Sequence, residues 1–230
     1  MTDVGQKHVL VLMGGWSAER EVSLASGEAC GEALEGAGYR VTYHDLQRNL
    51  PAFIEALEAV KPDVVFNALH GRFGEDGNIQ AVLNILDIPY THSGVKASSV
   101  AMDKPATLRL FDAAGIPVAQ GCVVAEADIT SGNWVNKNTI SRPFVIKPAC
   151  EGSSVGVYIV GENEPAPDLS DWTFGDALIE EYVAGKELTV AVMENEALTV
   201  TELQPNEGFY SYENKYTDGK TTHICPADIE

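Results

Sequence analysis

A lysine at the end of an apolar run, followed closely by a small-residue loop, forms the strongest chemical signal in this sequence. The run Phe144–Ile146 leads to Lys147 and a proline, and Glu151-Gly152-Ser153-Ser154 follows. A lysine that ends a buried strand needs a negative partner, because burying an unpaired ammonium is costly. Backbone N–H groups of a Gly/Ser loop bind phosphate oxygens. The pattern predicts a cover over a nucleotide triphosphate, in which Ser153 and Ser154 touch the transferred group. The alternative is a β-hairpin whose lysine reaches the surface.

A second candidate loop, residues 14–21, follows the first apolar run and begins with two glycines. It lacks the GxGxxG spacing of dinucleotide-binding folds, so that interpretation is weak. Glu19 and Glu21 could hold a substrate amine. The alternative is an ordinary helix N-terminus, in which serine caps the helix and acidic residues complement its dipole.

A third candidate loop, residues 70–77, carries a histidine and an arginine among three glycines. Glycine lets the backbone approach a ligand closely. His70 and Arg72 could interact with a carboxylate or a transferring phosphoryl group. The alternative is a tight turn in which Asp76 caps the next helix.

Further charged residues lie where a nucleotide could use them. Lys104 begins a helix, where its charge opposes the dipole unless it faces a phosphate. Glu180 and Glu187 flank a strand end that could hold an adenine and ribose, although both could equally be solvated charges. Lys215 and Tyr216 belong to the polar segment 206–223, which is predicted to be a long loop that closes over a triphosphate.

Alternating strands and helices must position loops 14–21 and 70–77. The pattern predicts strands over 8–13, 40–44 and 63–69 and helices over 23–37, 51–60 and 77–86. This alternation implies a parallel sheet with helices on both faces. Ligands gather at the carboxyl ends of such strands, where loops 14–21 and 70–77 lie.

The pattern changes after residue 102. A helix is predicted over 102–115, and the strand that returns from the Gly/Ser loop is predicted to open at Val155. Short apolar runs at 177–181, 186–192 and 198–202 predict one antiparallel sheet. The sequence therefore predicts an α/β amino-terminal part followed by an α+β part.

Composition narrows the class of protein. The 230 residues are 45% hydrophobic and 21% charged, with a formal charge of −19, which argues against binding to nucleic acid or to anionic membranes. The four cysteines show no CxxC spacing and are predicted to be reduced. No apolar run approaches the length of a membrane span, and we expect a cytoplasmic protein.

Six strings, taken in order, resemble the D-alanine–D-alanine ligase family of ATP-grasp enzymes. They are GGWSAEREVSLASG, ALHGRFGEDGNIQ, PYTHSGVKASSVAMDK, VIKPACEGSSVGV, IEEYVAGKELTVAV and FYSYENKYTDGKTTHICPA. The resemblance spans residues 14–227. It implies an open parallel-sheet (pre-ATP-grasp) domain at 1–103, a central ATP-grasp subdomain at 104–184 and the start of a carboxyl-terminal ATP-grasp subdomain at 185–230.

The resemblance also implies a reaction for cell-wall (peptidoglycan) synthesis. The carboxylate of a first D-alanine takes the γ-phosphoryl group of ATP, and the amine of a second D-alanine displaces phosphate from the acyl phosphate. Glu19 would bind the first ammonium in a hydrogen-bonded set with Ser153 and Tyr216, and His70 would lie near the first carboxylate. The residues implied for ATP are Lys104, Lys147, Ser153, Ser154, Glu180, Glu181, Val183, Glu187 and Lys215, with Glu181 and Val183 offering backbone groups to the base.

Magnesium is the implied metal, with Mn²⁺ as a substitute and K⁺ as an activator, and the implied assembly is a homodimer. The family's metal ligands follow the CPA string, so we expect them beyond residue 230, in a longer product of which this chain is part. Without them we expect negligible ligase activity. The alternatives are a D-alanine–D-lactate ligase, which Tyr216 argues against, another ATP-grasp carboxylate–amine ligase, and an inactive ATP-binding fragment.

Overall fold

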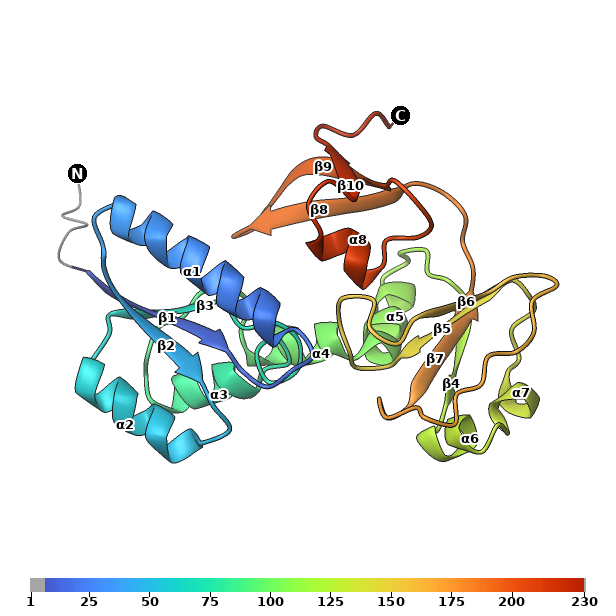
Figure 1. Ribbon diagram of the computed structural model, residues 1–230, viewed down its shortest axis with the longest axis horizontal. Helices are drawn as coiled ribbons and strands as arrows, with labels where there is room; N and C mark the ends of the chain where they lie inside the picture. The colour runs from blue at the N-terminus through green and yellow to red at the C-terminus, as the bar shows by residue number, and fades with distance from the viewer. Residues whose placement is uncertain (1–6, 230) are drawn as a thin grey trace. The chain divides into compact units, whose positions relative to one another are not determined.

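A computed structural model describes residues 7–229 of the chain (Figure 1). The chain divides into two compact units, residues 1–115 and 116–230, and each is described here by itself. The division into three domains expected from the sequence remains a prediction.

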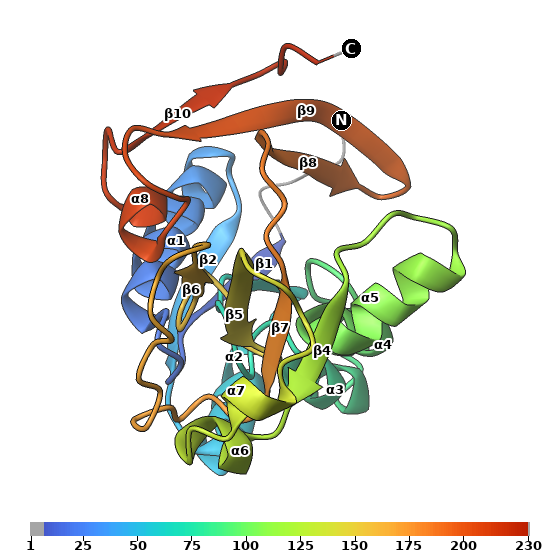
Figure 2. The same cartoon turned by 90° about the vertical axis from the view of Figure 1, so that its right-hand side faces the viewer.

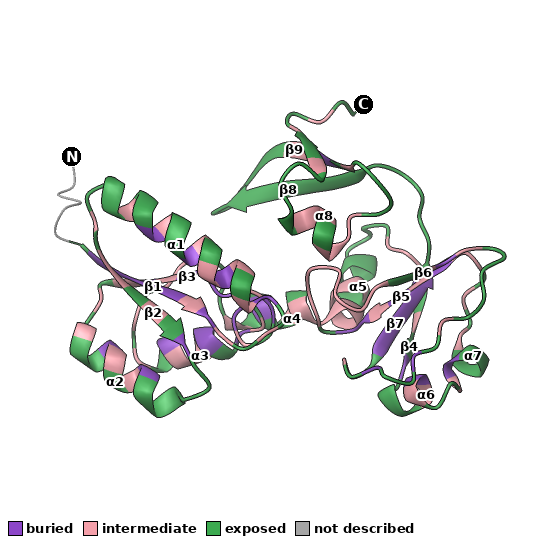
Figure 3. Ribbon diagram, viewed as in Figure 1, coloured by how far each residue is buried: buried purple, intermediate pink, exposed green. Residues whose placement is uncertain are grey.

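The first unit is built on the predicted parallel sheet. Strands β1 (His8–Gly14), β2 (Arg40–Leu46) and β3 (Val64–Asn67) lie in the order β2-β1-β3, and β1 pairs in parallel with both neighbours. Strand β1 is buried along most of its length (Figure 3). Met13 alone is half-buried among its residues. Leu10 and Leu12 pack in one core cluster and Val9 and Val11 in another, so both faces of the sheet are covered.

Five helices accompany this sheet among the described residues of the first unit. They are α1 (Arg20–Gly36), α2 (Leu50–Val60), α3 (Asn78–Ile85), α4 (Val95–Met102) and α5 (Lys104–Ala113). Helix α2 begins at the cap Asn49, whose side chain accepts a hydrogen bond from the Ala52 N–H, and ends at Lys61 in the left-handed region. The prediction of alternating strands and helices is confirmed, and α4 is an element that the sequence analysis did not assign.

The second unit contains a four-stranded antiparallel sheet in the order β4-β7-β5-β6 (Figure 2). Its strands are β4 (Gly121–Val124), β5 (Phe144–Pro148), β6 (Tyr158–Val160) and β7 (Ala177–Glu181), and short helices α6 (Glu126–Thr130) and α7 (Trp134–Lys137) connect β4 to β5. Phe144, Ile146 and Ile179 lie in its buried core. The returning strand begins at Tyr158, three residues later than predicted, because residues 153–156 form turns.

A separate antiparallel sheet in this unit has the order β10-β9-β8. It consists of β8 (Glu187–Met193), β9 (Glu196–Pro205) and β10 (Thr221–Ile224). Two predictions are corrected here. Residues 177–181 belong to the other sheet rather than to this one, and the segment 206–223 contains helix α8 (Tyr212–Tyr216) and strand β10 instead of one long loop.

Two broader expectations can be compared with the structure. The four cysteines are free thiols, as predicted. Among residues 7–229, no helix has both the length and the apolar character needed to cross a bilayer.

Candidate functional site

Ser23 joins the ends of β1 and β3, which lead into loops 14–21 and 70–77. Its fully buried hydroxyl accepts a hydrogen bond from the Gly14 N–H at 2.9 Å and donates one to the Ala68 carbonyl oxygen at 2.7 Å. Both backbone groups lie away from water, so each needs a protein partner. One side chain on helix α1 therefore fixes the spacing between the two loops.

Replacing Ser23 by alanine is expected to lower the free energy of unfolding by about 2 kcal/mol, because two buried backbone groups lose their partner. Urea unfolding of the purified chain measures this change. The control is Ser98→Ala, which removes a single hydrogen bond of 3.2 Å to the Ser93 carbonyl oxygen. Equal losses in the two variants would show that Ser23 does not join the loops.

Glu19 stands at the start of α1 and is only 3% exposed. Its side chain makes no capping hydrogen bond to the helix. Its backbone N–H donates to Ser17 Oγ at 3.1 Å, and Ser17 Oγ donates to the His70 carbonyl oxygen at 2.8 Å. The Ser17 hydroxyl thus brings the Glu19 and His70 loops together, and the capping alternative does not account for the Glu19 carboxylate.

The His70 loop is held in shape by Asp76 and Asn67. Asp76 accepts hydrogen bonds from the Phe73 and Asn78 N–H groups, at 2.9 and 3.1 Å. Asn67 Nδ2 donates to the Gly74 carbonyl oxygen at 2.9 Å. The predicted turn at Asp76 is confirmed, but its predicted role as helix cap is wrong, because the N-cap of α3 is Gly77 and no side chain caps that helix.

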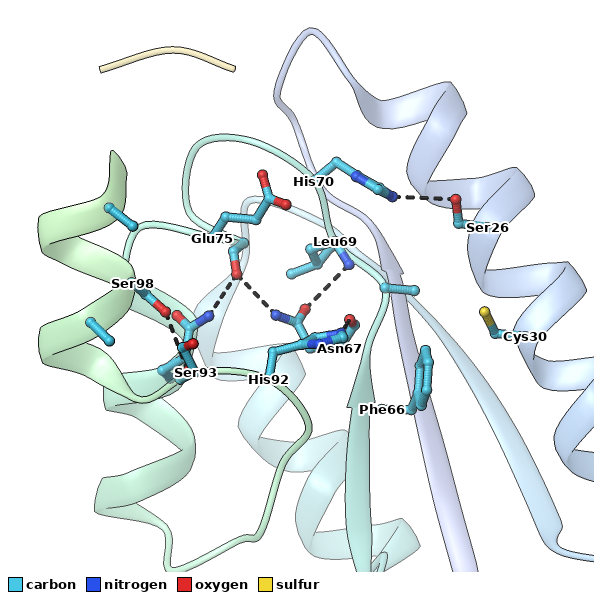
Figure 4. A pocket seen from close by; sticks show the side chains of 15 residues that line it. Ser26, Cys30, Phe66, Asn67, Leu69, His70, Glu75, His92, Ser93 and Ser98 are labelled. Atoms are coloured by element: carbon cyan, nitrogen blue, oxygen red, sulfur yellow. Dashed lines mark hydrogen bonds between the residues drawn. The ribbon is translucent and has the colours of Figure 1, made fainter. Parts of the chain in front are cut away.

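His70 and Glu75 line a cavity of about 510 Å³ in the first unit (Figure 4). His70 Nε2 lies 3.2 Å from Ser26 Oγ on helix α1, which orients the ring. The Glu75 carboxylate accepts a hydrogen bond from the Gly71 N–H at 2.6 Å. Burial raises the pKa of the Glu75 carboxyl, an effect that the hydrogen bond from Gly71 opposes and the nearby Glu19 adds to.

In the second unit, Lys147 forms an ion pair with Glu180. Lys147 lies in β5 and Glu180 in β7, and these strands pair with Val145 opposite Glu180, so the two charged side chains share one face of the sheet. The side chains are 24% and 12% exposed. Glu180 is thus the negative partner that Lys147 was predicted to need. The sequence analysis had assigned Glu180 to the adenine and ribose end of the nucleotide.

The Gly/Ser loop is strained and attached to helix α8. Ser153 and Ser154 both have positive φ, 51° and 60°, which is unusual for non-glycine residues. Ser153 Oγ lies 2.5 Å from the Tyr216 hydroxyl, and Ser154 Oγ donates to the Tyr210 carbonyl oxygen at 2.8 Å. Such strain is typical of functional loops, and here two hydrogen bonds to one segment hold it.

The other predicted nucleotide residues are spread over both units. Lys104 is the first residue of α5, in the first unit, and Lys215 lies in α8 with its ammonium 5.0 Å from the Tyr210 ring centroid. Val183 is exposed, and Glu187 begins β8. The Glu181 N–H donates to the Gln120 carbonyl oxygen, which leaves its carbonyl oxygen as the backbone group for a base.

Residues 7–229 contain no set of side chains that matches the ligand preference of magnesium. Among residues 7–229, the grouping with potential metal-ligand geometry is Glu19, His70 and Glu75, whose ligand atoms lie within 4.8 Å of one another. Magnesium prefers oxygen ligands in octahedral geometry. We therefore assign no magnesium contact to the described residues.

The sequence analysis missed several residues that shape these loops. Ser23 forms a hydrogen bond to a distant segment, and Asn67 holds the His70 loop through Gly74. Glu75 lies between Arg72 and Asp76, which both attracted attention. The two adjacent acids at positions 75 and 76 point to a role for Glu75. One acid is enough to form the turn, so the second needs another explanation.

Comparison with known proteins gives a consistent result. The family models "D-ala D-ala ligase C-terminus" and "D-ala D-ala ligase N-terminus" match residues 110–230 and 48–93. D-alanine–D-alanine ligases from Paramagnetospirillum magneticum and Zymomonas mobilis are 52% and 53% identical over 97% of this chain, which spans 72% and 70% of their lengths.

Solved structures agree with the sequence matches. The D-alanine–D-alanine ligase of Bacillus anthracis in complex with ATP superimposes with a TM-score of 0.74 at 27% identity, covering 98% of this chain and 72% of that protein. One family model matches more than half of the chain, and relatives are more than 50% identical to it. Together these matches assign the chain to a family. The chain belongs to the D-alanine–D-alanine ligase family of ATP-grasp enzymes.

Proposed function

We propose that the protein catalyses the ATP-dependent ligation of two D-alanine molecules, acting in the cytoplasm as a homodimer. The observation that carries this proposal most directly is the strained Ser153–Ser154 loop bonded to Tyr216 and Tyr210. Helix α8 holds the loop that would cover the phosphates, as a closing segment must.

The proposed reaction has two balanced steps. A carboxylate oxygen of the first D-alanine attacks the γ-phosphorus of ATP, and ADP leaves. The amine of the second D-alanine then attacks the acyl carbon, and phosphate leaves as the amide bond forms. In both steps charge develops on phosphoryl and acyl oxygens, so fixed cations and N–H groups provide most of the stabilisation.

The residues of this chain take the following roles. Glu19, in a set with Ser153 and Tyr216, binds the first ammonium, and His70 lies near the first carboxylate. Lys104, Lys147 and Lys215 neutralise the phosphates, while the backbone around Ser153 and Ser154 donates to phosphate oxygens. Glu180 and Glu187 bind the adenine and ribose end, with Glu181 and Val183 offering backbone groups. Magnesium would bridge the phosphates through ligands outside the described residues.

The test combines intact mass with product analysis. The purified protein is incubated with ATP, D-alanine, Mg²⁺ and K⁺, and phosphate and dipeptide are measured together. Dipeptide formation that depends on D-alanine supports the proposal, and an equal yield of depsipeptide with D-lactate as competing second substrate would assign a different acceptor.

For a polypeptide of 24.7 kDa, the decisive readout is binding, because the proposed ATP and D-alanine contacts lie within it. Each ligand should raise the melting temperature in proportion to its occupancy. A chain of that mass that binds neither ligand would contradict the proposal.

A further inference from the structure

Glu75 is an exposed residue that lines the cavity, and the proposed roles leave its carboxylate unexplained. Its loop already has a turn-forming acid in Asp76, which accepts two backbone hydrogen bonds. The Glu75 carboxylate instead points to the group formed with Glu19 and His70, in which one ligand atom of each residue lies within 4.8 Å of the others. Two carboxylates at such a distance repel each other in the absence of a cation.

The chemistry of this group favours an ammonium ion. An ammonium donates hydrogen bonds of about 2.8 Å in tetrahedral directions, which places its acceptors up to roughly 4.6 Å apart. Transition metals hold their ligands at about 2.0–2.2 Å and therefore need a tighter set. A primary ammonium accordingly suits acceptors spread over this distance.

A neighbouring acceptor in the same cavity points to a ligand with N–H donors. Gln80 is 1% exposed and lines the cavity together with His70 and Glu75. Its Nε2 donates to the Gly74 carbonyl oxygen at 2.8 Å. Within residues 7–229, Gln80 Oε1 is the buried side-chain polar atom that lacks a hydrogen-bond partner. The cavity thus contains a buried acceptor that a ligand N–H could satisfy.

We propose that Glu75 is a second carboxylate for the α-ammonium of the first amino-acid substrate, and that it acts together with Glu19 and His70 to select amino acids over acids without an amine. This inference rests on the proposed function, because it assumes that an amino acid binds to the first unit. Glu75 contacts the ammonium, while the Gly71 N–H holds the carboxylate in place.

A stability cost accompanies this role. Although the residue is exposed, partial desolvation of its carboxyl raises the pKa of Glu75, and the hydrogen bond from the Gly71 N–H opposes this shift. Stability gained from the protonated carboxyl is present at low pH and is lost as the pH rises through that raised pKa. The charged groups that act on Glu75 are His70, Glu19 and His92. A residue that destabilises the free protein at neutral pH and improves ligand binding fits a functional position.

The experiment compares Glu75→Gln with a matched control, Asp76→Asn. Both changes remove one carboxylate charge from the same loop and leave an oxygen that can accept a backbone hydrogen bond. Glu75→Gln is expected to raise the dissociation constant for D-alanine about tenfold and to raise the melting temperature of the free chain at pH 7. Asp76→Asn should leave the dissociation constant for D-alanine within about twofold of the wild-type value, and it should not raise the melting temperature.

The outcomes separate the two proposals. If wild type and Glu75→Gln bind D-alanine equally, while Glu19→Gln weakens binding, the role of Glu75 is wrong and the proposed function stands. If wild type does not bind D-alanine, the proposed function fails. One further measurement needs no variant: the ¹³C chemical shift of the Glu75 carboxyl is followed by NMR. It should move on addition of D-alanine and not on addition of propionate, and no movement with D-alanine would overturn the role.

Discussion

Replacing Lys147 by alanine is expected to raise the dissociation constant for ATP by roughly 10- to 150-fold, because a charge-assisted phosphate contact contributes about 1.5–3 kcal/mol. Lys147 lies on β5 next to the Gly/Ser loop, and its ammonium is held by Glu180. This pairing keeps the lysine side chain ordered before the nucleotide arrives, so less entropy is lost on binding.

The same substitution should also destabilise the chain. The Glu180 side chain is 12% exposed, and without Lys147 its carboxylate would be buried without this partner. Breaking a buried pair by removing one member costs about 3–5 kcal/mol, and we expect a value below that range because both side chains retain some solvent contact. ATP affinity must therefore be measured under conditions where the variant is folded, which circular dichroism establishes.

A matched control exists in the same unit. Lys186 pairs with Glu202 at 2.8 Å, and the Glu202 side chain is 5% exposed. Lys186→Ala also removes a lysine from a buried glutamate, yet we assign it no phosphate contact. It should lower stability and leave the ATP dissociation constant within about threefold of wild type. Equal losses of ATP affinity in the two variants would show that Lys147 acts through stability alone.

Periodicity predicted the parallel sheet of the first unit because β1 is a buried apolar run and helices α2 and α3 each bury one apolar face. Strand β1 has buried residues on both faces, and β1 to β3 alternate with helices in a single direction. Loops 14–21 and 70–77 followed at the carboxyl ends of β1 and β3, as expected for such a sheet.

Sheet membership in the second unit was harder to predict. Strands β7 and β8 are neighbours in the sequence, yet β7 lies between β4 and β5 while β8 pairs with β9. Every residue of β8 is exposed among the described residues, so its burial pattern carries no period. The short elements α8 and β10 were missed. Strand β10 is defined by its pairing with β9 rather than by local apolar spacing.

The candidate site was predictable where a residue type alone suggests a role, as for Lys147 or Glu19. It was not predictable where function depends on a distant partner. The pairing of Lys147 with Glu180 joins residues on two strands, and the Ser153–Tyr216 contact joins a loop to a helix. Glu75 required the positions of Glu19 and His70 in space. Spacing along a chain does not contain these distances.

Gly71→Ala is expected to weaken D-alanine binding at least tenfold, because Gly71 provides the space that the Glu19 carboxylate occupies. A Cβ atom at position 71 would overlap with Glu19 Oε2 and would lie 3.4 Å from Ser17 Cβ. Gly71 has a φ of +68°, and its N–H also holds Glu75. The methyl group must therefore displace one carboxylate, move the N–H that orients the other, or both.

Gly38→Ala separates this effect from backbone strain. Gly38 has a φ of +92°, and a Cβ atom there would meet nothing within 4 Å. Both variants should lose about 1–2 kcal/mol of stability from the left-handed backbone, but Gly38→Ala should retain the wild-type dissociation constant for D-alanine. ATP affinity should be unchanged in both. If calorimetry finds the same D-alanine affinity in Gly71→Ala as in Gly38→Ala, the Glu19 carboxylate does not bind the ammonium from its position beside Gly71. The ammonium would then have to be held by residues other than the Glu19, His70 and Glu75 group.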